Sequence, residues 1–207
     1  MPRVLFLGSI CLLALGGCAS MSKSQCLAND WETVGYRDGL SGAQSSALMK
    51  HQNACVKHGV VPDREAYIAG WRDGVEQYCQ PANGFSAGER GAGFSNVCPP
   101  HLQQSFHAAY QDGRQLYIAQ SEINHLVSAI SQREARLREV KAELAGIAGG
   151  MIDAESTVAD RATMVLTAKD LAQEQGHLEA EIEELQAEVA VKAERLEQLR
   201  HSLAFAS

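Results

Sequence analysis

The sequence contains no proline after Pro100 and, beyond Tyr117, only one aromatic residue, Phe205. The shortage of large rings excludes a second aromatic core in the C-terminal half, and the missing proline removes the strongest helix breaker from it. This half is rich in Ala, Glu, Leu, Gln and Arg, which favour helix. We therefore predict a small aromatic core in the first half of the chain and long helices in the second.

Blocks of positive charge are also absent. The formal net charge is −7, and the charges of the C-terminal half are mixed in sign along the chain. A nucleic-acid-binding surface needs a cationic footprint. We therefore expect no nucleic-acid partner.

Sequence motifs of common enzymes are absent too. The chain has no Gly-x-Ser-x-Gly elbow, no Walker-type phosphate loop and no two-histidine zinc motif. The glycine-rich stretch 84–93 lacks the lysine and hydroxyl residue that complete a phosphate loop, so we interpret residues 81–99 as an irregular connector. We expect no catalytic residue, no cofactor and no enzyme activity.

The N-terminus has an apolar run, but one too short to cross a bilayer. Residues 4–15 follow Arg3 and fall well below the roughly 20 residues of a membrane-spanning helix, as in a signal peptide. The run ends in Leu15-Gly16-Gly17-Cys18, which resembles a bacterial lipoprotein processing box. We predict a signal peptide over residues 1–17 and acylation of Cys18, for example by palmitate. The alternative is an ordinary secretory signal in which Cys18 is incidental.

The residue after Cys18 bears on where the protein is anchored. It is Ala19 rather than aspartate, which resembles the outer-membrane sorting pattern of cells with two membranes. Two or more acyl chains make membrane anchoring stable. We expect residues 18–25 to form a lipid anchor and linker that hold the protein on the outer membrane, facing the periplasm.

Four cysteines remain after Cys18: Cys26, Cys55, Cys79 and Cys98. An even number in an oxidising compartment indicates two disulfides. Four cysteines allow three pairings. We favour Cys26–Cys55 and Cys79–Cys98, because each closes a local loop.

One short phrase occurs three times in the first half. In each copy an Asp-Gly pair follows a small residue and an aromatic residue, and the copies place their small residues at Gly35 and Gly39, Gly70 and Gly74, and Ala109 and Gly113. Residues four apart share one face of a helix. Glycine in a helix costs close to 1 kcal/mol against alanine, which close packing must offset. We predict three related helices that cross at these faces, with Asp38, Asp73 and Asp112 as structural hydrogen-bond acceptors.

Capping signals indicate where helices of the first half begin and end. Residues 45–58 are expected to form a helix that Gly59 terminates. Asp63 is expected to cap a helix that runs to about Tyr78, and Pro99-Pro100 to open the third one.

Spaced Gly, Cys and aromatic positions over residues 24–117 resemble the bacterial lipoprotein family named domain of unknown function 2799. The residues that carry the resemblance are Asp30-Trp31, Gly35-Tyr36-Arg37-Asp38-Gly39, His51, Cys55, Gly59, Pro62-Asp63, Tyr67, Gly70, Gly74, Tyr78-Cys79, Asn83-Gly84-Phe85, Gly88, Gly91 and Val97-Cys98-Pro99. The resemblance implies a secreted, lipid-anchored small domain with no assigned activity. The helical tail lies outside it.

The tail carries two runs of coiled-coil heptads. The first contains Ile123, Leu126, Ile130, Leu137, Val140, Leu144 and Ile147, with Arg133 as the exception; the second contains Leu171, Leu178, Ile182, Leu185, Val189, Leu196, Leu199 and Leu203. We predict a chain reversal at residues 146–150, with Asp153 as a cap, that folds the runs into an antiparallel hairpin. The alternative is an interrupted parallel coiled coil between subunits.

The second helix is expected to be about 65 Å long at 1.5 Å per residue. That length overhangs the predicted first arm, which begins near residue 116. Part of the apolar seam would then need another chain, so we expect a protein partner or a homo-oligomer.

Two alternative kinds of site are a zinc site and an acid–base catalytic site. His51, Cys55 and His58 have a spacing that zinc accepts, but no fourth ligand has an obvious place and Cys55 is expected in a disulfide. The three aspartates of the repeats could act as acids and bases in a shared cleft. Their identical place in each repeat favours a structural role instead.

Taken together, the sequence predicts an all-α protein with a small disulfide-stapled helical head that contains internal repeats, followed by a long coiled-coil helical hairpin. We expect the head over residues 26–115 and the coiled coil over 116–207. The expected function is that of a lipid-anchored structural or interaction protein of the cell envelope, with a coiled-coil arm for self-association or partner binding. The alternative is a periplasmic enzyme or metal-binding head that uses Asp38, Asp73, Asp112 or the pair His51 and His58.

Overall fold

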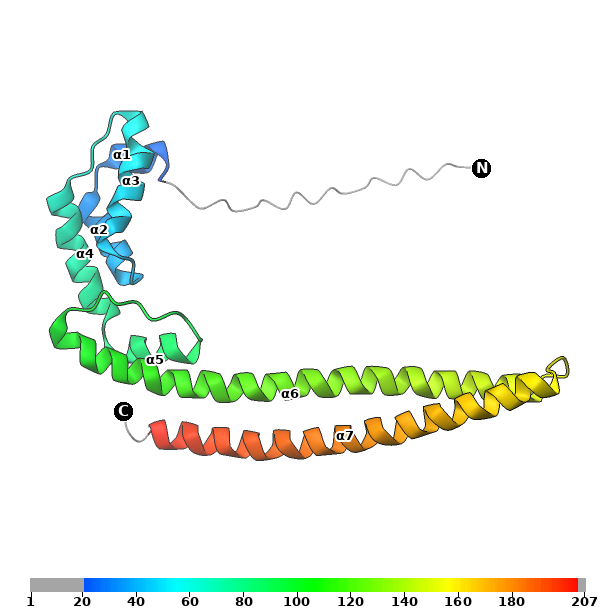
Figure 1. Cartoon of the computed structure of the whole chain (residues 1–207). Helices are drawn as coiled ribbons and strands as arrows, with labels where there is room; N and C mark the ends of the chain where they lie inside the picture. The colour runs from blue at the N-terminus through cyan, green and yellow to red at the C-terminus, as the bar shows by residue number, and fades with distance from the viewer. Residues whose placement is uncertain (1–20, 205–207) are drawn as a thin grey trace, which may run out of the picture. The chain divides into compact units, whose positions relative to one another are not determined.

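The structure, a computed structural model, describes residues 21–204, and within that range its regular structure is entirely helical (Figure 1). The predicted signal peptide and Cys18 lie outside the described residues. The α-helices are α1 (Lys23–Ala28), α2 (Trp31–Leu40), α3 (Leu48–Cys55), α4 (Arg64–Tyr78), α5 (Pro81–Glu89), α6 (Pro100–Ile152) and α7 (Val158–Ala204). The all-α prediction is confirmed.

The chain divides into two compact units. Of the described residues, the first unit holds those up to Gln80 together with Ser95–Gln103, and therefore α1 to α4. The second unit holds Pro81–Phe94 and the described residues from Gln104 on, and therefore α5, most of α6, and α7. Helix α6 runs without a break through residue 116, where the sequence suggested a change from head to coiled coil.

The helix ends of the first unit follow the capping signals. Asp63 Oδ1 accepts hydrogen bonds from the backbone N–H groups of Glu65 and Ala66, at 2.9 and 3.0 Å, and so caps α4. Gly59, with φ +73°, ends the helical stretch 45–58, which consists of α3 flanked by a 3₁₀ turn on each side. Both predictions are confirmed.

Helices α2 and α4 approach each other backbone to backbone. A Cβ added at Gly35 would lie 2.0 Å from the Tyr67 carbonyl oxygen, and one at Gly39 would lie 2.2 Å from that of Trp71. The contact is reciprocal, because a Cβ at Gly70 would lie 2.0 Å from the Glu32 carbonyl oxygen. No side chain other than hydrogen fits there, so the two phrases mark one shared helix crossing.

The third phrase packs against a helix that the sequence analysis missed. Residues 81–89 form α5 instead of the predicted irregular connector, and only the part after it is a loop. A Cβ at Gly88 would lie 2.1 Å from the Tyr110 carbonyl oxygen, and one at Gly113 would lie 2.0 Å from that of Phe85. The repeats therefore form two helix pairs rather than three related helices, since α5 contributes a fourth small face.

The two pairs correspond residue by residue. The turn after α2 places Gly42, with φ +73°, against the Tyr78 ring, and the turn after α5 places Gly91, with φ +69°, against the Tyr117 ring. In the first pair Trp71 Nε1–H donates to the Ala43 carbonyl at 2.8 Å. In the second pair Tyr110 Oη–H donates to the Ala92 carbonyl, also at 2.8 Å. We name these the first pair (α2 and α4) and the second pair (α5 and α6).

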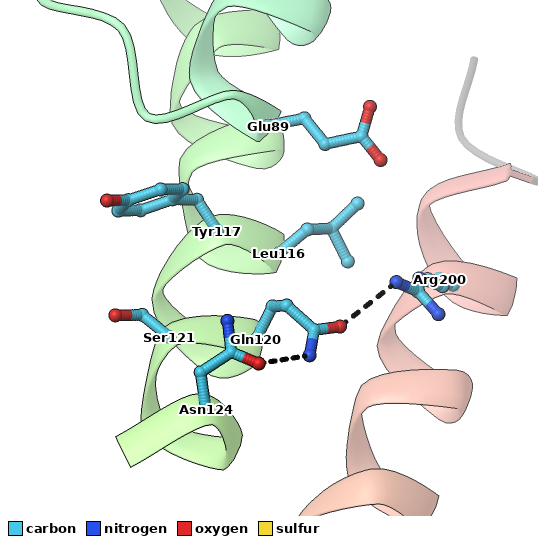
Figure 2. Close-up of a pocket in the computed structure, with 7 residues that line it drawn as sticks. All are labelled: Glu89, Leu116, Tyr117, Gln120, Ser121, Asn124 and Arg200. Atoms are coloured by element: carbon cyan, nitrogen blue, oxygen red, sulfur yellow. Dashed lines mark hydrogen bonds between the residues drawn. The ribbon is translucent and has the colours of Figure 1, made fainter. Parts of the chain in front are cut away.

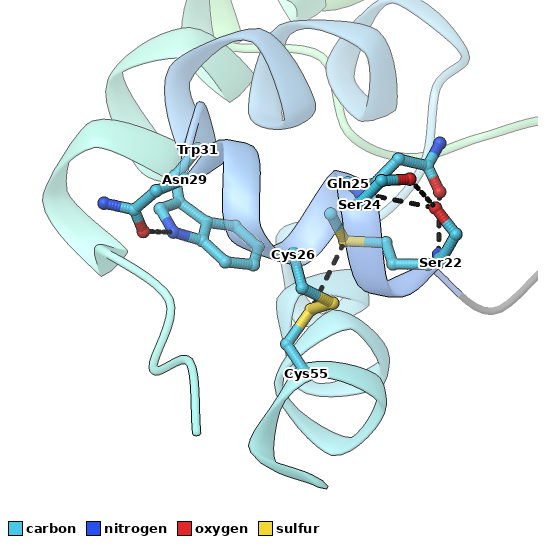
Figure 3. Close-up of a disulfide and its surroundings, with 8 residues drawn as sticks. Ser22, Ser24, Gln25, Cys26, Asn29, Trp31 and Cys55 are labelled. Atoms are coloured by element: carbon cyan, nitrogen blue, oxygen red, sulfur yellow. Dashed lines mark hydrogen bonds between the residues drawn. A yellow bond between two sulfur atoms is a disulfide. The ribbon is translucent and has the colours of Figure 1, made fainter. Parts of the chain in front are cut away.

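The core of the first unit is built around a disulfide. Cys26 and Cys55 are bonded, and Figure 3 shows the bond together with Trp31. Both cysteines are fully buried in one cluster with Trp31 and Tyr67. Cys79 and Cys98 form the other disulfide. These are the pairings that the sequence favours.

Helices α6 and α7 form the predicted antiparallel hairpin (Figure 1). Heptad residues of both arms are buried along it: Ile123, Val140, Leu171, Ile182 and Leu196. Ion pairs cross between the arms, including Arg136 with Glu174 through two hydrogen bonds of 2.7 and 3.0 Å, and Lys192 with Glu122 at 2.9 Å. Opposite charges at these positions fix the register of the arms.

Two details of the hairpin differ from the prediction. Helix α6 continues through the glycines at 146–150, and α7 is capped by Thr157, whose hydroxyl accepts from the Asp160 N–H, rather than by Asp153. The predicted overhang is also wrong. Because the first arm begins within the helix of the third phrase, Leu199 and Leu203 of α7 still find apolar partners in the cluster around Leu116.

Within residues 21–204, none of the helices combines enough length with enough apolar character to cross a bilayer.

Candidate functional site

A polar cluster of three side chains joins α2, α3 and α4 in the first unit. Tyr67 Oη–H donates to Asp38 Oδ2 at 2.6 Å, and His51 Nε2 donates to the same oxygen at 2.8 Å. The disulfide positions the histidine, because His51 and Cys55 lie four residues apart on α3 and Cys55 is tied to α1. We call these residues the Asp38 cluster.

The cluster lies at the edge of the core. Tyr67 is fully buried, whereas the side chains of Asp38 and His51 keep about a fifth of their surface exposed, 21% and 20%. Burial, together with the adjacent Asp38 carboxylate, raises the pKa of Tyr67 well above its ordinary value. The phenol therefore stays protonated and serves as a donor.

The second pair lacks this cluster, although its backbone is equivalent. Ala87 stands at the position of Asp38, and the buried Phe106 stands at that of Tyr67. The Asp38 and Ala87 carbonyls accept equivalent hydrogen bonds from Ala43 and Ala92, which fixes the correspondence. The fold of a pair therefore does not require the polar cluster.

The other candidate residues do not join Asp38. Asp73 is exposed, and Asp112 accepts a hydrogen bond from Gln115 of its own helix at 3.3 Å. His58 lies in the 3₁₀ turn after α3. Across residues 21–204, no group of three or more His, Cys, Asp or Glu side chains is placed to hold a metal ion. The three aspartates therefore do not converge in a shared cleft, and that alternative is wrong.

An open groove of about 520 Å³ lies beside the α4 face of the first unit. Its uncharged lining residues are Ser45, Ile68, Ala69 and Trp71. Three charged side chains surround them, namely Arg64, Glu65 and Arg72. The groove thus combines an aromatic surface with an excess of positive charge.

A smaller cleft of about 250 Å³ lies in the second unit, where α5, α6 and α7 meet (Figure 2). Its polar groups largely satisfy one another: Arg200 donates to Gln120 Oε1 at 3.4 Å, and Gln120 Nε2 donates to Asn124 Oδ1 at 3.2 Å. The Arg200 contact links α7 to α6. The polar groups of the cleft thus serve as structural cross-links rather than as a binding site.

The double variant Asp38→Ala, Tyr67→Phe is expected to lose less free energy of unfolding than the sum of the losses of the two single variants. Asp38→Ala leaves the buried Tyr67 hydroxyl without its acceptor, which costs about 2 kcal/mol, and Tyr67→Phe loses one charge-assisted bond. The double variant imitates Ala87 and Phe106, so its cost should fall below the sum by about 1–2 kcal/mol.

Urea unfolding followed by tryptophan fluorescence measures this cycle, because Trp31 and Trp71 both belong to the first unit. Strictly additive costs would contradict the coupling between Asp38 and Tyr67.

Sequence reasoning missed Tyr67, the groove and α5. A signal for α5 exists: the spacing of Gly84, Gly88 and Gly91 repeats that of Gly35, Gly39 and Gly42. Aligning these triplets also aligns Ser45 with Phe94, which points to the groove. Aligning Gly70 and Gly74 with Ala109 and Gly113 aligns Tyr67 with Phe106, which points to the tyrosine. The partner of Asp38 itself depends on how α2 and α4 are rotated, which spacing alone does not fix.

Comparison with known proteins gives a family match for part of the chain. Residues 30–115 match the family described as "Protein of unknown function (DUF2799)", which confirms the resemblance seen in the sequence. No curated protein matches the chain, and no solved structure does. The second pair reaches the end of the matched segment, whereas most of the hairpin lies beyond it.

Proposed function

We propose, from the premise that residues 30–115 form a DUF2799 domain, that the protein is a lipid-anchored structural or interaction protein of the cell envelope. Its anchor would be the acylated Cys18 in the outer membrane, and its hairpin arm would bind itself or another envelope protein in the periplasm. The proposed role is not enzymatic.

The observation that carries this proposal is the composition of the hairpin end. Helix α7, with 47 residues, is about 70 Å long, and the seam between the arms is filled along its length. At the end where α6 passes into α7, however, large apolar side chains face solvent: Ile152, Val158, Val165 and Leu166, each more than half exposed. Large apolar side chains that face solvent along one segment are a feature of interaction sites.

A photo-crosslinking residue at Leu166 in living cells tests this function directly. We expect Leu166, which is 66% exposed, to capture a second copy or a defined envelope protein. The matched control is the exposed Glu183 in the middle of α7, which should capture much less. A strictly monomeric chain in sedimentation, with no product at Leu166, would contradict the proposal.

The anchor is tested separately, by metabolic labelling with a palmitate analogue. Label should enter the natural chain and be lost in Cys18→Ala. Equal labelling of both chains, or of neither, would leave the arm without the proposed attachment and would favour an ordinary secretory signal.

A further inference from the structure

The groove beside α4 occupies a place that is filled in the second pair. There the Phe94 ring packs against Tyr110 and His107, with ring centroids 5.2 and 5.0 Å away, and against Phe106 at 6.0 Å. Phe94 follows Gly91 by three residues, just as Ser45 follows Gly42. The first pair therefore carries a small hydroxyl residue where the second pair supplies a ring.

The wall on which such a ring would lie includes an aromatic residue in both pairs. Trp71 stands at the position of Tyr110 and Ile68 at that of His107, and both line the groove. Trp71 is half-buried and held by its hydrogen bond to the Ala43 carbonyl. The indole is thus fixed in place, with part of its surface available to a second aromatic ring.

The charged residues of the groove have no counterpart in the second pair. Arg64 and Arg72 stand where the second pair has Gln103 and Gln111. Both arginines are exposed, and within the described part of the chain neither guanidinium has an ion-pair partner. Moreover, a cation in the first turn of a helix is disfavoured by the helix dipole, so the stability of α4 does not account for Arg64.

We propose that this groove binds an aromatic side chain of a partner polypeptide in which carboxylates flank the ring. The ring would take the place on Trp71 that Phe94 takes on Tyr110, and the flanking carboxylates would accept hydrogen bonds from Arg64 and Arg72. The occupant is a peptide residue because the equivalent place is filled by a residue of the chain itself. This site deepens the proposed interaction role and rests on it only for the choice of a polypeptide partner.

The binding test uses the full-length chain in detergent micelles and the two indole N–H resonances as reporters. The probe is an acetylated tripeptide amide with a central phenylalanine between two aspartates. We expect it to shift the Trp71 resonance in a saturable manner and to leave that of Trp31, which is 1% exposed, unchanged. Probes with a central alanine, or with asparagines in place of the aspartates, should bind at least about tenfold more weakly.

Two sets of variants make the test specific. Ser45→Phe imitates Phe94 and should abolish binding, whereas Ser46→Phe, at an exposed neighbour that does not line the groove, should preserve it. Arg64→Gln and Arg72→Gln imitate Gln103 and Gln111, and each should weaken binding about tenfold. The unfolding midpoint of Ser45→Phe shows separately that the head remains folded.

Unchanged binding by folded Ser45→Phe, or no shift of the Trp71 resonance with the probe at millimolar concentration, would overturn the site. Binding of 3-phenylpropionate as tightly as the peptide would overturn the choice of a polypeptide. Either failure leaves crosslinking at Leu166 unaffected, so it is distinguishable from failure of the arm.

Discussion

Gly70→Ala is expected to destabilise the first unit by at least about 3 kcal/mol, although alanine is the better helix former. The new Cβ would lie 2.0 Å from the Glu32 carbonyl oxygen and 3.0 Å from the Tyr36 backbone nitrogen. A flexible side chain could move aside, but these atoms belong to the backbone of α2. The helices must therefore separate, and the contacts along their whole crossing weaken. Urea unfolding followed by tryptophan fluorescence measures the loss.

The matched control is Gly176→Ala in α7. Nothing lies within 4 Å of a Cβ added at Gly176, so this variant should gain up to about 1 kcal/mol, as the helix propensities alone require. Circular dichroism follows that change, because the hairpin contains no tryptophan. A stability gain in Gly70→Ala as well would show that the close approach of α2 and α4 is not real.

The second large effect is expected from the buried disulfide. Replacing Cys26 and Cys55 together by alanine should lower the free energy of unfolding of the first unit by about 3.5 kcal/mol, since the bond joins residues separated by 29 positions. The bond also ties α3, and with it His51, to α1. The Trp31 fluorescence spectrum of the variant should therefore shift toward that of an exposed indole at lower urea concentrations.

Replacement of Cys79 and Cys98 by alanine provides the comparison. This bond joins residues separated by 19 positions, and Cys98 is only partly buried. The double alanine variant should lose a little less stability and should leave the hydrogen bond between His51 and Asp38 intact. An equal collapse of the Trp31 environment in both variants would contradict the separate role of the first disulfide.

Sequence reasoning predicted those features that depend on local pattern. The heptads of α6 and α7, the Asp63 cap and the position of each Asp-Gly pair inside a helix follow from spacing alone. It failed at α5, because Gly84 and Gly88 lower helix propensity, and the close contact with α6 overrides that preference. The prediction of a loop considered only the low helix propensity of glycine. It did not consider that glycine also allows two helices to pack closely.

The candidate site was predictable only in part. Asp38 and His51 stand out as titratable residues, but their meeting depends on the inserted α3, which the second pair does not have. The groove is visible only by comparison of Ser45 with Phe94, after both helix pairs have been recognised. The groove results from a difference between the two helix pairs, so the sequence of one pair alone does not reveal it.

The return of α7 along α6 has a practical consequence for labelling. Because Leu203 packs near Leu116 and Phe85, a fluorescent label attached at the C-terminal end of α7 would report on the part of the arm next to α5. A small epitope inserted in the connection at residues 153–157 would report on its far end, where exposed turns tolerate insertion. Distances inferred from tagged chains will therefore depend on which of the two positions carries the tag.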